Sequence, residues 1–169
     1  QAWWAVVIVL LVAGSLYLAY LFSYLYLWTV SPQLWPGNAG DTATADPRGP
    51  ASAGLLLASS AGILLCRHLL SQGRTLAMSI AILMSCLLLA SSLVADVLAH
   101  WQTGLRPQTN AYGAMVYMAG FLQAQLVVLV ATIALFGVAR ALTGRLDAVR
   151  RNSFDCLSLF WHYTTCQGL

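Results

Sequence analysis

Three histidines are the first candidates for chemistry, and each lies near the end of a separate apolar stretch. Two histidines that face each other across neighbouring helices can ligate a haem iron. If the apolar stretches are alternating membrane helices, His68 and His162 lie near one face of the membrane, and His100 lies near the other. We therefore predict hydrogen bonding at the membrane interface for these side chains, and not a bis-histidine haem site.

Three further polar side chains lie within or beside apolar stretches. For Asp96, near a helix end, the sequence leaves two roles open: a relay for protons or ions, or a carboxylate bonded to the turn at Trp101 or exposed to water. Gln123 and Gln125 lie inside a later apolar stretch, where an amide is expected to find a partner across a helix interface or a lipid head group.

No arrangement typical of a catalytic site is visible in the sequence. The four cysteines form no CxxC pair, and their apolar surroundings favour buried packing over a disulfide or a metal site. There is also no Gly-rich phosphate loop, no cluster with metal-ligand spacing and no nucleophile–base pair. We expect no catalytic, cofactor-binding or metal-binding residue in this chain.

The composition identifies the solvent in which the chain folds. It is 60% hydrophobic and 8% charged, with a mean hydropathy of +0.76, whereas soluble domains contain about 25% charged residues. The net charge of +3 comes from arginines and aspartates spread over the connecting segments, which indicates membrane topology and not nucleic-acid binding. The chain is therefore predicted to be an integral membrane protein.

We predict an all-α, polytopic membrane helix bundle that forms a single domain over residues 1–169. Its elements are four complete transmembrane helices and the start of a fifth: about 3–28, 51–70, 76–98, 112–138, and from about 154. Each complete stretch is long enough to cross a hydrocarbon core of roughly 30 Å. The chain opens without methionine and stops in an apolar run, so we expect a piece of a longer polypeptide.

Small residues suggest how the second span packs. Gly54, Ala58 and Gly62 recur at spacings of four, which places them on one helix face that is expected to pack closely on a neighbouring helix. Chance in an alanine-rich segment is the alternative. A tight link containing Gly73 then predicts that the second and third spans form an antiparallel hairpin.

The arginines predict the orientation of the bundle. The connectors after the second and fourth spans hold most of them: Arg67, Arg74, Arg140, Arg145, Arg150 and Arg151. Only Arg48 and Arg106 lie on the opposite side. By the positive-inside rule, the first group is predicted to be cytoplasmic.

Three motifs in chain order resemble subunit III of the haem–copper cytochrome c oxidases. The link from Cys66 to Arg74, with His68 and Gly73, is similar to the family's AHH…EGN/R turn. The second motif lies in the fourth span: Tyr112-Gly113 followed by Ala119-Gly120-Phe121 is similar to the family's YG…TGFHGLH. The third motif lies at the start of the fifth helix: Phe154-Asp155 followed by Phe160-Trp161-His162-Tyr163 is similar to FE…YWHF. The resemblance covers nearly the whole chain and matches a five-helix form that lacks two helices at the start.

The chain departs from the family's pattern at several polar positions. The carboxylate inside the family's third helix falls at Gly14, and the histidines of GFHGLH fall at Leu122 and Gln125. The aspartate after WHF falls at Thr165. Any role of these family side chains is therefore not carried over to this chain.

The resemblance implies an accessory, non-redox subunit of a bacterial respiratory terminal oxidase in the inner (cell) membrane, where oxygen reduction is coupled to proton pumping. It implies subunits I and II and membrane lipids as partners, haem and copper in those subunits, and a bound phospholipid. The residues expected at lipid or subunit contacts are His68, Arg74, Gln125, Trp161 and His162. The chain itself would support assembly, lipid binding and proton uptake.

Three alternatives remain open from the sequence. The closest is a subunit III-like chain of a quinol oxidase or a nitric oxide reductase. From a different class comes a small transporter or proton channel that works alone, with Asp96 and the glutamines as its path; Gly14 at the carboxylate position argues against it. A membrane haem protein would need facing histidines.

Overall fold

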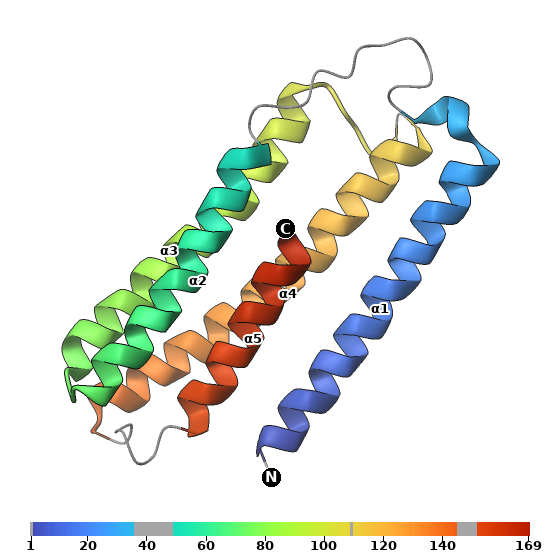
Figure 1. The fold of residues 1–169 in the computed structure, drawn as a ribbon. Coiled ribbons are helices and arrows are strands. Elements are labelled where there is room, and N and C mark those ends of the chain that lie inside the picture. The colour runs from blue at the N-terminus through green and yellow to red at the C-terminus, as the bar shows by residue number, and fades with distance from the viewer. Residues whose placement is uncertain (1, 36–48, 109, 145–151) are drawn as a thin grey trace.

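The computed structural model describes residues 2–35, 49–108, 110–144 and 152–169. Within these ranges the chain forms five α-helices and one short 3-10 helix, and no strand (Figure 1). They are α1 (Ala2–Val30), η1 (Pro32–Leu34), α2 (Gly49–Ser71), α3 (Thr75–Gln102), α4 (Ala111–Leu142) and α5 (Asn152–Gly168). The prediction of an all-α polytopic bundle is confirmed.

Four of the helices are long and apolar enough to cross a membrane: Trp3–Val30, Pro50–Ser71, Thr75–Gln102 and Ala111–Leu142. They contain the four predicted spans, and most of them extend a few residues further. The extension is largest at the end of α3 and α4, where hydrophobicity falls but the backbone continues as helix. At about 1.5 Å per residue, helices of 28 and 32 residues are longer than a hydrocarbon core of roughly 30 Å.

The fifth helix begins at Asn152, two residues before the predicted start, and has 17 residues. One face of α5 is buried, with Phe154, Leu157 and Trp161 almost completely inaccessible. In Figure 1 it lies among the other helices, and its end at the C-terminus is about half-way along the bundle. This short helix therefore fills the interior of the bundle from one end.

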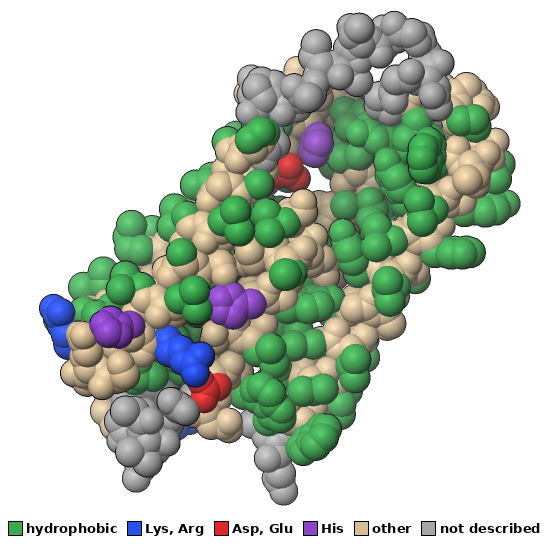
Figure 2. Space-filling model, viewed as in Figure 1, with side chains coloured by type: hydrophobic (Ala, Val, Ile, Leu, Met, Phe, Trp, Pro, Cys, Tyr) green, Lys and Arg blue, Asp and Glu red, His purple; other side chains and the backbone are tan. Residues whose placement is uncertain are grey.

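The helices pack in an order that leaves α1 at the edge. Contacts join α2 to α3, α3 to α4, α4 to α5, and α2 to α5. Helix α1 packs on α5 and α4, and none of the residues in its most apolar window is buried. Hydrophobic side chains are spread over the face shown in Figure 2 and are densest on its right side, where α1 lies, as expected for a surface that faces lipid or another subunit.

The core lies between α2, α3, α4 and α5. Its fully buried members include Ile63, Ile82, Val130 and Trp161. The predicted hairpin of the second and third spans is present, and Gly73 closes α2 with a φ of 70° in the left-handed region. The amides of Gly73 and Arg74 then donate to the carbonyls of Leu70 and Leu69, which satisfies the end of the helix.

The topology places three basic side chains at one end of the bundle. Arg67 lies near the end of α2, Arg74 lies on the α2–α3 link and Arg140 lies near the end of α4. Arg106 follows α3 at the other end. The other arginines used for orientation (Arg48, Arg145, Arg150 and Arg151) lie outside the described residues. The cytoplasmic assignment of the basic end stays a prediction.

Candidate functional site

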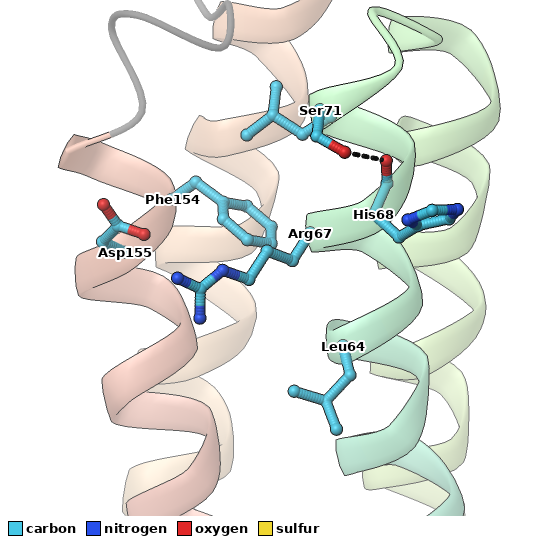
Figure 3. A pocket seen from close by; sticks show the side chains of 7 residues that line it. Leu64, Arg67, His68, Ser71, Phe154 and Asp155 are labelled. Atoms are coloured by element: carbon cyan, nitrogen blue, oxygen red, sulfur yellow. Dashed lines mark hydrogen bonds between the residues drawn. The ribbon is translucent and has the colours of Figure 1, made fainter.

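A cavity of about 320 Å³ opens between α2 and α5 at the basic end of the bundle. It is lined by Leu64, Arg67, His68, Leu70, Ser71, Phe154 and Asp155 (Figure 3). Leucine and phenylalanine side chains form its apolar part, and the charged groups come from both helices. The cavity therefore combines apolar and ionic surface near the end of α2.

The two charged side chains of this cavity come from opposite walls. Arg67 extends its guanidinium from α2 towards α5, on which Asp155 lies (Figure 3). His68 is exposed, and its ring turns away from Asp155. The His68 Nε2 atom lies 2.9 Å from the side-chain amide nitrogen of Gln72. The backbone carbonyl of His68 accepts a 2.7 Å hydrogen bond from the Ser71 hydroxyl. Arg67 is therefore the cation that faces the cavity.

Adjacent residues of α5 hold adjacent serines of α2. The Trp161 indole nitrogen donates to the Ser59 hydroxyl oxygen at 3.0 Å, and both side chains are fully buried. One residue later, the His162 Nδ1 atom lies 2.7 Å from the Ser60 hydroxyl oxygen. A hydrogen bond of His162 was predicted at the membrane interface, but its partner Ser60 lies at the middle of α2, so the bond is present and the predicted position near a span end is wrong. These contacts fix the rotation of α5 against α2.

A third polar contact joins α5 to α4. The Gln123 amide nitrogen donates to the Thr164 carbonyl at 3.0 Å, and the Thr164 hydroxyl donates to the Phe160 carbonyl at 2.8 Å. The helix-to-helix partner predicted for Gln123 is therefore found. The neighbouring Gln125 side chain is exposed on α4 and lines a smaller cavity shared with α1 and α5.

The structure distributes the predicted contact residues over three places. His68 lines the large cavity, and Arg74 is exposed nearby on the α2–α3 link, outside the cavity lining. Trp161 and His162 lie at the α2–α5 contact, and Gln125 lies on the side of α1. Whether lipids or other subunits contact these residues stays a prediction.

Only one of the three small residues predicted to pack on a neighbour does so within the described chain. A Cβ atom at Gly62 would collide with the Ser85 hydroxyl of α3, whereas a Cβ at Gly54 would meet nothing within 4 Å. Ala58 is exposed. The core-facing positions of α2 include Ser59, Ile63 and Cys66, so Gly54 and Ala58 lie on a different side of the helix. Their contact with a partner chain stays a prediction.

Asp96 lies near the end of α3, at the other end of the bundle. Its carboxylate is 3.7 Å from the His100 Nε2 atom, one helical turn away, and both side chains are partly exposed. The Arg106 guanidinium carbon lies 3.4 Å from the centre of the Trp101 ring. Asp96 therefore lies near the end of α3 beside His100, and the choice between its two predicted roles stays a prediction.

Metal-ligating side chains do not gather in the part of the chain that the structure describes: no group of three or more His, Cys, Asp or Glu residues could hold an ion there. All four cysteines lie in described segments and are free. Cys66 and Cys156 are buried, as the packing interpretation predicted, whereas Cys166 is exposed.

Sequence reasoning missed Arg67, Phe154 and Asp155 as residues of one cavity, and it missed the two serines that hold α5. The sequence did mark the first group, because Arg67 adjoins His68 of the first family motif and Asp155 belongs to the Phe154-Asp155 motif at the start of the fifth helix. The pairing of α2 with α5 across a separation of about ninety residues was not visible, because it depends on the rotation of both helices.

Fold and contacts together define a multi-pass helical membrane protein whose last helix is fixed by buried polar contacts. Comparison with known protein families identifies the family: cytochrome c oxidase subunit III matches residues 4–167. The chain belongs to this family, whose members are subunits of haem–copper oxidase complexes. No curated protein matches the chain.

Proposed function

We propose that this chain is the accessory subunit III of a bacterial respiratory cytochrome c oxidase, the terminal oxidase that couples oxygen reduction to proton pumping. The family match over residues 4–167 carries the proposal. In it, subunits I and II hold the haem and copper and perform the redox chemistry. This chain packs beside them in the inner membrane, stabilises the assembly and supports proton uptake by subunit I.

The contacts of α5 support a scaffolding role. Trp161 and His162 belong to the motif that resembles the family's last helix, and both bind serines of α2. Polar contacts between membrane helices are worth about 0.6 kcal/mol on average and up to about 1.7. Two such contacts on successive residues favour one fixed packing of α5, and therefore one surface presented to partner subunits.

A phospholipid belongs to the proposal as a structural ligand. The cavity between α2 and α5 offers the Arg67 guanidinium to a phosphate and apolar walls to the first part of an acyl chain. Arginine suits this task because its planar group forms paired hydrogen bonds with phosphate oxygens. His68 and Arg74 are exposed at the same end of the bundle, and in this proposal they contact neighbouring head groups.

Removing the chain tests the accessory role. Oxidase prepared from cells with and without this chain is compared for haem and copper per catalytic subunit, oxygen consumption and proton uptake in vesicles. We expect unchanged haem and copper content, a smaller yield of complex and slower proton uptake. Loss of haem or copper in proportion to the missing chain contradicts the proposal. Activity with reduced cytochrome c, quinol or nitric oxide then identifies the electron donor and acceptor.

A further inference from the structure

A second cavity lies between α1, α4 and α5, away from the basic end. Its volume is about 50 Å³, and it is lined by Ala13, Leu16, Tyr17, Leu122, Gln125, Leu126 and Gln167. Tyr17 is near the middle of α1 and Gln125 near the middle of α4. If these two helices span the membrane, the cavity lies close to the bilayer centre.

One polar atom at this cavity has no hydrogen-bond partner among the described residues. The Gln167 side-chain oxygen is buried and accepts no hydrogen bond from any described residue. Leaving such an acceptor unsatisfied in an apolar interior costs about 1–3 kcal/mol. The Tyr17 hydroxyl and the Gln125 amide belong to the same lining, but no hydrogen bond between described residues joins the three side chains. The cavity thus brings the Tyr17 hydroxyl, the Gln125 amide and the Gln167 oxygen together without a hydrogen bond between them.

The lining also decides which ligand fits. It contains no charged residue, so it offers nothing to compensate a desolvated ion. Nearby on α1, Gly14 carries no charge, and a Cβ atom there would lie 3.6 Å from the Tyr163 hydroxyl. A buried water needs about 10–15 Å³ and two to four polar partners. The cavity is larger than that volume, and Tyr17, Gln125 and Gln167 line it with polar groups.

We propose that this cavity is a hydration site, in which ordered water donates to the Gln167 oxygen and bridges it to Tyr17 and Gln125. The water joins α1 to α4 and α5, the helices on which α1 packs. The side-chain hydrogen bonds that Ser15, Ser23 and Thr29 of α1 donate stay within the helix, and none of the residues in its most apolar window is buried. The hydration site therefore acts as the polar attachment of α1 to the bundle.

Two measurements on the purified membrane complex that contains this chain test the proposal. The first is a cryo-EM map that resolves buried waters elsewhere in the complex. We expect a compact density within hydrogen-bonding distance of the Gln167 oxygen, and its loss in Gln167→Met. An empty cavity in such a map, or density continuous with an acyl chain or a partner's side chain, overturns the proposal.

The second measurement is thermal release of the chain from the complex, followed on native gels, in a double-mutant cycle of Tyr17→Phe with Gln167→Met. A shared water predicts that each change lowers the release temperature and that the pair lowers it less than the sum of the two. A dry cavity predicts the opposite for Gln167→Met, because removing an unsatisfied acceptor raises the release temperature. Tyr26→Phe is the matched control: Tyr26 is on the same helix with an exposed side chain, so its effect should add to that of Gln167→Met.

Discussion

Replacing Gly62 by alanine tests the packing of α2 on α3. The new Cβ atom would collide with the Ser85 hydroxyl oxygen and lie 3.3 Å from the Ser85 Cβ. The hydroxyl cannot move freely, because it donates a 2.9 Å hydrogen bond to the Ala81 carbonyl. Either Ser85 gives up this bond, or the two helices separate by a small distance. Gly62→Ala is therefore expected to destabilise the hairpin.

The magnitude follows from two opposing effects. Overpacking a close contact costs about 1–3 kcal/mol, and replacing glycine by alanine inside a helix gains about 0.8–1 kcal/mol. Gly54→Ala is a matched control, since it makes the same change on the same helix where nothing lies within 4 Å of the new atom. The two variants should differ by the overpacking alone, which is about 1–3 kcal/mol, or roughly 5- to 150-fold in the unfolding equilibrium.

The assay is equilibrium unfolding of the isolated chain in mixed micelles, followed by circular dichroism as the denaturing detergent increases. Ser85→Gly in the Gly62→Ala background should recover most of the loss, because the nearest remaining atom, the Ser85 Cα, lies 4.0 Å from the new Cβ. Equal effects of Gly62→Ala and Gly54→Ala, or the absence of rescue, would show that α2 and α3 do not meet at this position.

Three further results are expected. Gly62→Leu places a larger side chain against Ser85 of α3, disturbs the hairpin and thereby weakens assembly with the partner subunits. An unchanged complex on native gels argues against this prediction. Trp161→Phe removes the hydrogen bond to Ser59 and lowers unfolding stability by at least about 0.6–1.7 kcal/mol; strict additivity with Ser59→Ala in the same unfolding assay would contradict a direct bond. Arg67→Gln reduces the phospholipid retained by the purified complex, measured by lipid mass spectrometry, whereas the control Arg106→Gln, which alters an arginine at the other end of the bundle, retains more lipid; equal retention by both variants argues against the cavity.

The helices could be predicted because length and hydrophobicity alone determine which segments cross a membrane. The same signal ended α3 at residue 98 in the prediction, whereas the helix continues to Gln102. Hydrophobicity marks the edge of the hydrocarbon core, but the backbone hydrogen bonds of a helix continue into the head-group region.

The contacts between helices could be predicted only in part. Spacing placed Gly54 and Gly62 on one face, but it does not specify how α2 is rotated, and only Gly62 faces α3. The cavity of Arg67 and Asp155 and the site at Gln167 each need helices that are distant in sequence. Rotation and crossing depend on the packing of all helices together.

The most direct test of the central claim is purification of this chain from its native membrane in mild detergent, with a reduced-minus-oxidised spectrum and mass spectrometry of the proteins that accompany it. Membership of an oxidase complex predicts haem a bands, copper and two larger subunits in the same preparation. A chain that purifies alone and without colour would contradict the account and favour a transporter that works by itself.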